Sequence, residues 1–445
     1  MDCTSGDLDR LSALPDDLLH VILGRLGFAP TVTKTAVLSR RWRHVWTQAK
    51  SLTFKDDDTY LKRKRDFVGF VDWVLAQRDD AAMESLEIKF NLKGRTSTAE
   101  KINEWLRYAA QRVVRVDFDL GPLELDQQVI EFPSHGRATS ISLDLSYNRF
   151  RLPDVAVASY QSLRKLRLMS LEFDEFEERS TIGDFVASCC PRLRRLSIMD
   201  AKGMPRLVLR TEVLEKLYIS ADDLQMLDVV APKLRIIKLN CCSDAVVRIV
   251  APRLEQINGS FPSKLPDLYI HDLKSVRRLK RLWLDMHGKY LGDGDDAFWL
   301  LQNCTGVQEV DMSVHHEHTM DELLDLTSEG KALFANIALE SLQDVKITGF
   351  GGTDEEMQLV SLLFDSSNSV KSMSIALVRT PPKSKKQLDA LSWQHWIGAE
   401  AAETIYHELM KIPCADLGHW RFVKRRKQPR RTFTWTRDTT HQRRR

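Results

Sequence analysis

The stretch PRLRRLSIM (residues 191–199) carries the phrase on which the fold of most of this chain depends, because Leu193, Leu196 and Ile198 follow the pattern Leu-x-x-Leu-x-Leu. Apolar residues that alternate in this way turn toward one side of a short β-strand. Twelve copies of the phrase or its Val/Ile variants occur, with first positions 20 to 35 residues apart. The clearest copies begin at Leu163, Leu193, Leu214, Leu234 and Leu279, and the weaker ones at Met83, Val113, Ala138, Leu254, Val307, Leu342 and Val370.

One such strand cannot bury its apolar face alone, whereas stacked copies form a continuous core under a curved parallel sheet. The spacers can form helices, since apolar residues share one helix face within 67–75 and within 102–109. The pattern resembles an irregular leucine-rich-repeat array over roughly residues 80–380. We therefore predict an α/β fold, in which a short all-helical module precedes a leucine-rich-repeat solenoid with helices on its convex side. The alternative is an ordinary α/β domain with a parallel sheet.

The helical module lies at residues 9–54, DRLSALPDDLLHVILGRLGFAPTVTKTAVLSRRWRHVWTQAKSLTF. Leu14, Leu18, Ile22 and Leu26 fall four apart and form an apolar helix stripe. A second helix rich in tryptophan and arginine follows a Gly/Pro turn. A module of about 45 residues is close to the lower limit for an independent core. Part of this apolar surface is therefore expected to bind another protein.

These residues resemble the F-box in three blocks, Asp9-Arg10-Leu11, Leu14-Pro15-Asp16 and VLSRRWRHVW (37–46). The resemblance implies docking on the Skp adaptor of a cullin-RING (SCF) ubiquitin ligase. One departure is the turn at residues 26–30, LGFAP, where many members have Leu-Pro and a shorter connection. An amphipathic core helix is the alternative interpretation, which the Trp-rich second half disfavours. The resemblance implies these adaptor-binding residues: Leu14, Pro15, Leu18, Ile22, Leu23, Leu26, Val37, Leu38, Arg41, Trp42 and Trp46.

The segment from Leu339 to Leu377 resembles the FBD-type module that ends many plant F-box/leucine-rich-repeat proteins. The resemblance rests on the strand at Lys346-Ile347, the Gly-rich turn at 349–352 and the strand at 371–375. It implies a plant origin and no chemistry. The predicted organisation is a flexible N-terminus (1–8), the F-box (9–54), the repeat array (55–338), an FBD-like region that continues the array (339–420), and a basic disordered tail (421–445).

Strand alternation also predicts which side chains face solvent on the concave side of the array. The early strands present Glu87, Asp117, Asp119 and Asp144, and the later strands are again acidic. The middle strands are basic, which predicts binding of an acidic or phosphorylated protein segment. A merely solvated sheet face and a site for a small anionic ligand are the alternatives. The predicted substrate-binding residues are Lys165, Arg167, Arg195, Lys216, Tyr218, Lys238, Arg281 and Trp283.

Composition limits the class of protein. The chain has 445 residues, 43% hydrophobic and 29% charged, without an apolar run long enough to span a membrane. The seven cysteines show no disulfide pattern, which favours a reducing compartment. We therefore expect the protein to be located in the nucleus, the cytoplasm or both. From residue 421 onward, 11 lysines or arginines and one aspartate give a net charge of +10, against +3 for the whole chain, so the remainder carries −7.

The basic tail has three interpretations: a nuclear-import signal, a nucleic-acid-binding arm in which Phe433 and Trp435 stack on bases, and a disordered solubilising end. Disorder with nuclear targeting is favoured, and nucleic-acid binding is disfavoured. The predicted import residues are Lys424, Arg425, Arg426, Lys427, Arg430 and Arg431.

Enzyme chemistry has little support in the sequence. The acidic turn at 292–296, GDGDD, lacks a glutamate at the twelfth position of a calcium loop, and the HHEH run at 315–318 lacks a spaced partner for a metal. Neither a phosphate-binding Gly loop nor a catalytic triad can be assembled. We therefore predict a non-enzymatic substrate receptor of an SCF ligase that has no cofactor or metal. The alternative is a non-ligase interaction scaffold, or a nucleic-acid adaptor that uses the tail.

Overall fold

The structure, a computed structural model, divides into two compact units. The first comprises Met1–Leu214 with Ser220–Asp223, and the second comprises Glu215–Ile219 with Leu224–Arg445. The structure describes residues 14–56, 66–78, 82–90, 99–121, 125, 128–174, 181–241, 245–260, 268–271, 273–285, 296–315, 339–365, 369–377, 399–412, 418–424 and 431–438.

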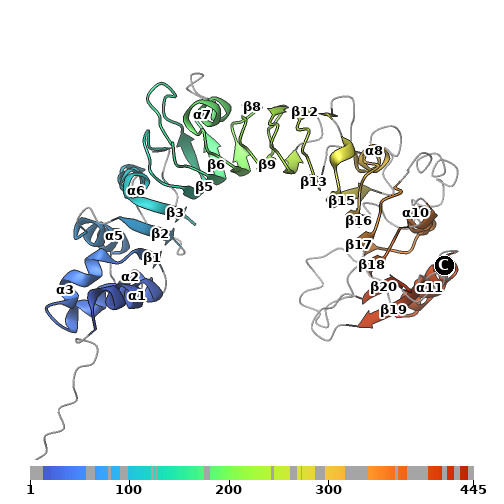
Figure 1. Cartoon of the computed structure of the whole chain (residues 1–445), viewed down its shortest axis with the longest axis horizontal. Coiled ribbons are helices and arrows are strands. Elements are labelled where there is room, and N and C mark those ends of the chain that lie inside the picture. Colours follow the sequence, from blue (N-terminus) through green and yellow to red (C-terminus); the bar gives the residue numbers. More distant parts are fainter. Residues whose placement is uncertain are drawn as a thin grey trace, which may run out of the picture. The chain divides into compact units, whose positions relative to one another are not determined.

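The first unit begins with a small helical module next to strand β1 (Figure 1). Its elements are α1 (Asp16–Leu26), α2 (Ala29–Lys34), the 3₁₀ turn η1 (Thr35–Val37), α3 (Trp42–Val45) and the 3₁₀ turn η2 (Trp46–Gln48). Leu19 and Leu23 of α1 are fully buried, because the stripe on that side of the helix faces the rest of the module. Gly27 ends α1 with a positive φ of 58°, and its carbonyl accepts a 2.8 Å hydrogen bond from the backbone N–H of Thr53 in β1. The turn thus attaches the module to the sheet.

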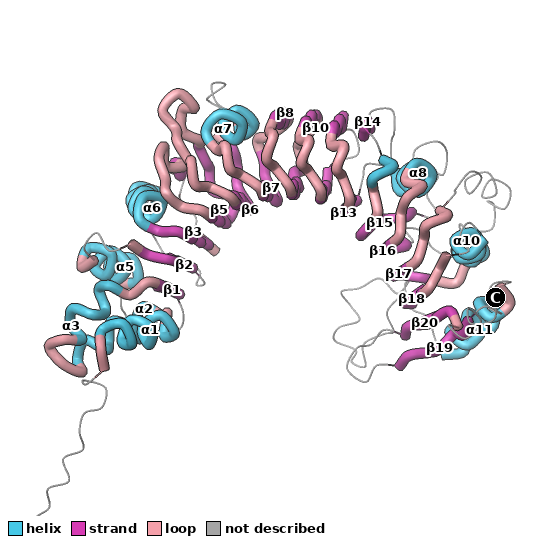
Figure 2. The backbone as a smooth tube through the Cα atoms, in the orientation of Figure 1, coloured by secondary structure: helices cyan, strands magenta, loops and turns pink. Residues whose placement is uncertain are grey.

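The strands of the first unit form a parallel arrangement in the order β1-β2-β3-β5-β6-β7, with β4 paired to the second half of β5. Helices α5, α6 and α7 lie along one side of these strands (Figure 2). The elements are β1 (Ser51–Asp56), α5 (Phe67–Ala76), β2 (Met83–Phe90), α6 (Ala99–Arg112), β3 (Val113–Asp119), β4 (Val129–Glu131), β5 (Ser140–Arg151), β6 (Lys165–Phe173), α7 (Ile182–Cys189), β7 (Arg195–Lys202) and β8 (Arg206–Arg210).

The repeated phrase builds the core of this unit. Its second and third positions are buried in each strand, as in Leu166 and Leu168 of β6. The buried side faces the helices, since Phe90 of β2 contacts Phe67 of α5 and Trp105 of α6 at ring-centroid distances of 5.1 and 6.4 Å. The intervening polar side chains therefore face away from the helices.

The second unit continues the same pattern. Neighbouring strands from β11 to β18 are parallel, a smaller parallel sheet holds β10, β12 and β14, and β9 has residues in both units. Its elements are β9 (Lys216–Ala221), β10 (Met226–Val230), β11 (Ile236–Cys241), β12 (Val246–Val250), β13 (Gln256–Ser260), β14 (Leu268–His271), η3 (Leu273–Ser275), β15 (Arg278–Asp285), α8 (Asp296–Asn303), β16 (Glu309–His315), β17 (Asp344–Phe350), α10 (Asp354–Asp365), β18 (Ser372–Leu377), α11 (Ala399–Met410), β19 (Gly418–Lys424) and β20 (Arg431–Arg437).

The prediction of a disordered tail is wrong for its described residues. β20 pairs antiparallel with β18, and β19 pairs antiparallel with β20. The reason is the sequence TFTWT (432–436), in which β-branched and aromatic residues alternate as in a half-buried strand. Trp435 is buried and packs edge-on against Phe364 of α10 with ring centroids 4.9 Å apart, and Phe433 stacks on Tyr406 of α11. Neither Phe433 nor Trp435 is therefore free to stack on nucleic-acid bases.

The mixed α/β fold, with a helical N-terminal module and a mostly parallel sheet, is confirmed. Within the described residues, no helix is both long and apolar enough to span a bilayer.

Gly259 provides a test of the strand packing in the second unit. Its φ of +134° is rarely adopted by other residues, and a Cβ there would lie 1.8 Å from the carbonyl oxygen of Leu239 in β11. We expect Gly259→Ala to lower the free energy of unfolding by about 1–3 kcal/mol. The matched control is Gly24→Ala in α1, where no atom lies within 4 Å of the new Cβ. It should raise stability by about 0.5–1 kcal/mol. Equal urea midpoints for the two variants would contradict this packing.

Candidate functional site

The helical module exposes a group of large apolar side chains, here called the apolar patch: Leu18, Val21, Leu26, Val37 and Leu38. Leu18 and Val21 are 47% and 53% exposed on α1, and Val37 and Leu38 are 84% and 55% exposed at the end of η1. The guanidinium of Arg41 donates a 2.8 Å hydrogen bond from Nε to Asp16. This ion pair joins the segment after η1 to the first turn of α1. Five large exposed apolar side chains within one small module are expected of a protein-binding surface.

The structure separates the predicted adaptor-binding residues into two sets. Leu14, Pro15, Leu18, Ile22, Leu26, Val37, Leu38 and Arg41 are exposed or half-buried on the module. Leu23, Trp42 and Trp46 are buried within the chain, so a direct contact of these three with a partner is not compatible with this fold. Trp46 stacks on Trp73 of α5, with ring centroids 5.6 Å apart, which explains its burial. Sequence reasoning missed Val21, although its position three residues after Leu18 places it on the same helix face.

A second candidate surface lies on the polar side of the sheet in the first unit. Here Arg115 of β3, Ser140 of β5, Lys165 of β6 and Arg195 of β7 occupy one row of directly paired positions. Arg167 of β6 lies in the next row, beside Ser142 and Ser197. We call Arg115, Lys165, Arg167 and Arg195 the basic cluster. Among the residues that the structure describes, these four side chains form neither a hydrogen bond nor an ion pair.

Carboxylates border the basic cluster. Asp117 of β3 lies in the row of Arg167, two strands away, and Asp119 of β3 and Asp144 of β5 lie in the next row, where Asp144 is directly paired with Met169 of β6. Glu87 of β2 is already engaged, since it accepts hydrogen bonds from Lys89 (2.6 Å) and from the hydroxyl of Thr53 (3.0 Å). Burial raises the pKa of Asp117 above its ordinary value. This side of the sheet therefore has an unpaired basic part and an adjoining acidic part.

The corresponding side of the second unit contains two ion-paired lysines. Lys280 of β15 lies 2.9 Å from Glu309, and Lys346 of β17 lies 3.0 Å from Asp311. The predicted residues Lys216, Tyr218 and Lys238 are half-buried on β9 and β11. Among the described residues Lys216 and Lys238 form no ion pair, and the ion-paired Lys280 and Lys346 were not among the predicted residues.

Arg281 departs from the predicted row. The pairing of β15 with β16 shifts between Lys280 and Leu282, and Arg281 has a positive φ of 55°. This β-bulge inserts Arg281 as an extra residue, so the row position belongs to Lys280. Trp283 lies in β15, but its side chain is outside the described residues.

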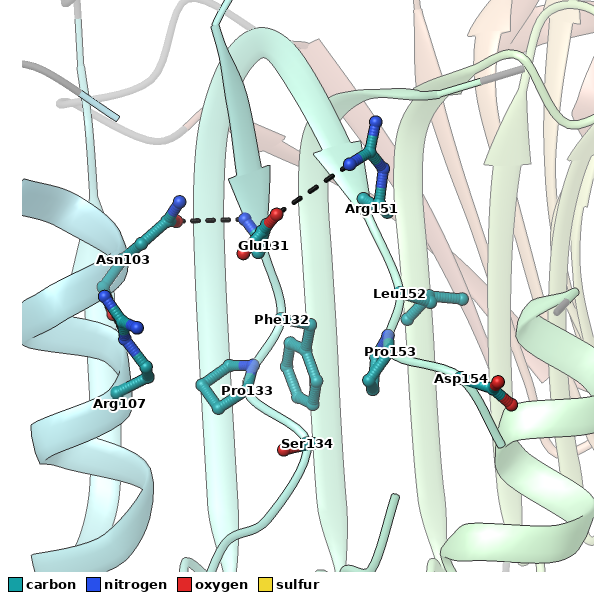
Figure 3. Close-up of a pocket in the computed structure, with 10 residues that line it drawn as sticks. All are labelled: Asn103, Arg107, Glu131, Phe132, Pro133, Ser134, Arg151, Leu152, Pro153 and Asp154. Carbon is teal, nitrogen blue, oxygen red and sulfur yellow. Dashed lines mark hydrogen bonds and ion pairs between the residues drawn. The ribbon is translucent and has the colours of Figure 1, made fainter. Parts of the chain in front are cut away.

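Figure 3 shows a pocket of about 450 Å³ in the first unit, between α6, the residues after β4 and the end of β5. The side-chain oxygen of Asn103 accepts a 2.9 Å hydrogen bond from the backbone N–H of Glu131 (Figure 3). Arg151 lies 3.8 Å from Glu131 and 2.6 Å from Asp174. Because cations and carboxylates alternate around its wall, the pocket lacks a strong preference for either charge. Sequence reasoning missed it, since it combines three separate segments.

Arg149, Arg151 and Asp174 form an ion triad beside this pocket, and we expect its contribution to stability to depend on pH. Burial alone would raise the pKa of Asp174, but hydrogen bonds from Arg151 and Arg149 outweigh burial and hold the pKa below its ordinary value. Such a group stabilises the fold above its unfolded pKa of about 3.9, and the effect is lost as pH falls through the lower folded pKa. We expect Asp174→Asn to lower stability at about pH 7 and to have little effect at about pH 2. An equal loss in urea unfolding at both pH values would contradict this assignment.

Within the described residues, there is no group of three His, Cys, Asp or Glu side chains that could hold a metal ion. Residues 292–295 of the acidic turn and residues 316–318 of the HHEH run lie outside the described part. Burial raises the pKa of the Cys304 thiol to about 12 and also raises the pKa values of Cys189 and Cys190, which makes them poor nucleophiles. Of the predicted import residues, Lys424 and Arg431 lie in β19 and β20, and residues 425–430 lie outside the described part.

Comparison with known proteins shows what this chain resembles. Residues 11–53 match the F-box domain. An FBD-associated F-box protein from Arabidopsis thaliana is 32% identical over 202 residues, 44% of each chain. An F-box/FBD/LRR-repeat protein from the same plant is 29% identical over 250 residues, 53% of this chain and 50% of the relative. The chain thus spans about half the length of these relatives.

A further FBD-associated F-box protein from Arabidopsis thaliana is 24% identical over 397 residues, which cover 83% of this chain and 93% of the relative. These matches confirm the resemblance that the sequence motifs indicated. Residues 11–53 of the chain thus match the F-box domain, and longer parts of the chain are similar to plant proteins named F-box/FBD/LRR-repeat or FBD-associated F-box proteins.

Proposed function

We propose that this protein is the substrate receptor of an SCF ubiquitin ligase, which docks on the Skp adaptor through its F-box. F-box domains generally bind the Skp adaptor in such complexes. The apolar patch is the main support for this proposal. Its large apolar side chains are exposed to water beside the buried core of the helical module. Removing such surface from water is the main favourable contribution to most protein–protein association. The patch lies within residues 11–53, the part that matches the F-box domain.

The repeat strands form, in this proposal, a leucine-rich-repeat solenoid with a curved sheet over residues 55–338. The FBD-like region from residue 339 onward continues and closes it. The antiparallel hairpin of β19 and β20 supports this role, because it covers the open edge of β18. Covering an exposed strand edge prevents pairing with other chains, as terminal caps do in other repeat proteins.

The polar side of the array holds the target protein, through residues among Lys165, Arg167, Arg195, Lys216, Tyr218 and Lys238. The chain itself is not catalytic, since F-box proteins are generally adaptors and the ubiquitin transfer belongs to other subunits. Its contribution is proximity, because a tethered target meets activated ubiquitin at a high effective concentration.

The test is co-expression of the full chain with a plant Skp adaptor, followed by light scattering on the purified material. A complex of one chain with one adaptor is the expected result. Absence of a complex with several adaptor isoforms would contradict the proposal and favour a non-ligase interaction scaffold. In that case the LGFAP turn at residues 26–30, which departs from the F-box pattern, would be the first feature to test as the cause of the lost binding.

A further inference from the structure

We propose that the basic cluster of the first unit is a binding site for one phosphorylated side chain of a protein segment, followed by an apolar residue. This inference rests on the proposed function, since it specifies the chemistry of the target. It narrows the target surface to Arg115, Lys165, Arg167 and Arg195.

The geometry of the strands brings these four cations together. Adjacent parallel strands lie about 4.8 Å apart, and positions two residues apart on one strand are separated by about 6.6 Å. Lys165 is directly paired with Arg195, and Arg167 lies one row further along the same strand. The long side chains of Lys165, Arg167 and Arg195 can therefore reach a common point, and Arg115, two strands or about 10 Å from Lys165, lies at the edge of the cluster. The hydroxyl of Ser140, which lies between Arg115 and Lys165, adds a neutral donor.

The lack of internal partners leaves this charge to be balanced by a ligand. Several other lysines, by contrast, have carboxylate partners, as with Lys89 and Glu87 in the first unit or Lys346 and Asp311 in the second. A phosphorylated side chain carries about −1.5 to −2 charges and three acceptor oxygens, whereas a carboxylate carries one charge. Arginine forks bind phosphate oxygens through paired hydrogen bonds. Three arginines and a lysine therefore match a phosphate better than a single carboxylate.

The surrounding charges exclude a long polyanion. Asp117 of β3 lies in the row of Arg167, and Asp119 of β3 and Asp144 of β5 lie in the next row. A nucleic acid that entered the cluster would bring its following phosphates against these carboxylates, since one phosphate recurs at every nucleotide. A protein segment with a single phosphate avoids this repulsion. Lysine or arginine on the acidic side of that segment would add a favourable contact.

The apolar part of the site lies beyond Arg167. Met169 of β6 and Met199 of β7 are directly paired, half-buried and on the same side of the strands as the cluster. Methionine side chains at a binding surface provide an adaptable apolar contact. Met169 lies two residues from Arg167 and four from Lys165, about 7 to 13 Å along the strand. An extended ligand would therefore place an apolar residue two to four positions from its phosphate.

The experiment uses the full chain, immobilised by an N-terminal tag, and three degenerate peptide libraries with a fixed phosphoserine, serine or glutamate. We expect the phosphoserine library to be retained at least about tenfold more than either of the others, with apolar residues enriched two to four positions from the phosphate. The double variant Arg167→Glu/Arg195→Glu should lose this retention. The control Lys280→Glu/Lys346→Glu has the same charge change in the second unit and should retain it.

Equal retention of the phosphoserine and serine libraries would overturn the proposal, as would unchanged retention by Arg167→Glu/Arg195→Glu. Equal retention of the glutamate library would overturn the assignment to phosphate. Tighter binding of an oligouridine RNA than of the phosphoserine library would instead show a nucleic-acid surface. Co-purification with the Skp adaptor is measured on the same variants. A chain that retains phosphopeptides but does not bind the adaptor would refute the proposed function alone, and the converse would refute this inference alone.

Discussion

Replacing both Leu18 and Leu38 by glutamate is expected to weaken binding to the Skp adaptor by at least about a hundredfold, because two apolar anchors are lost and two charges would be buried. Both side chains are about half exposed in the free chain, so the fold should tolerate the change. Calorimetric titration of the purified adaptor into each variant measures the affinity, and circular dichroism verifies that the helices and strands are retained.

The matched control for this variant is Val157→Glu. Val157 is 56% exposed in a turn of the first unit, far along the sequence from the helical module. The control introduces the same type of charge at a similarly exposed apolar position and should bind the adaptor like the wild-type chain. Equal affinities for Leu18→Glu/Leu38→Glu and Val157→Glu would show that the apolar patch is not the adaptor surface.

Truncating Trp435 to alanine is expected to lower the free energy of unfolding by about 3–5 kcal/mol, because it removes a large buried side chain from the end of the second unit. Trp435 packs against Phe364 of α10 and faces Trp420 of β19 through direct strand pairing. The loss should detach the hairpin and expose the neighbouring basic residues to trypsin. Urea unfolding and limited proteolysis measure the two effects.

Thr436→Ala serves as the control for the hairpin. Thr436 is exposed on the same strand, so its truncation should change stability by no more than about 0.5 kcal/mol. A disordered end of the chain would give the same stability for Trp435→Ala, Thr436→Ala and the wild type, and the wild type would already be cleaved rapidly after residue 424. That pattern would refute the strand pairing of β20 with β18.

Sequence reasoning succeeded where the signal was local and repeated. The phrase at Leu193, Leu196 and Ile198 predicts a strand because its alternation alone specifies which side is buried, and β7 follows it. The helical module was recognisable for a similar reason, since its apolar residues have helical spacing. Both patterns depend only on neighbours within one element.

The missed features depend on tertiary packing. Helical spacing places Leu18 and Leu23 on broad apolar surfaces, but only the packing of α1 shows that Leu23 is covered and Leu18 is not. The buried state of Trp46 depends on Trp73, which belongs to another helix. Arg281 was misplaced because a β-bulge shifts the alternation by one residue. These outcomes require knowledge of the neighbouring elements.

Composition misled the interpretation of the C-terminal end. Its net charge of +10 favours disorder, although TFTWT within it has the alternation of a strand. The buried side chains of Phe433 and Trp435 determine the structure of β20 despite this charge. The basic cluster was partly predictable, since alternation identified Lys165, Arg167 and Arg195. Arg115 was missed because it precedes the acidic residues of β3.

Hydrogen exchange of the full chain with and without the Skp adaptor tests the central claim most directly. We expect binding to slow amide exchange in α1 and in residues 35–41, the segments that carry Leu18, Val21, Val37 and Leu38. The strands of the first unit should exchange at unchanged rates. Protection confined to the sheet, or unchanged exchange throughout the helical module in a formed complex, would contradict adaptor docking through the apolar patch.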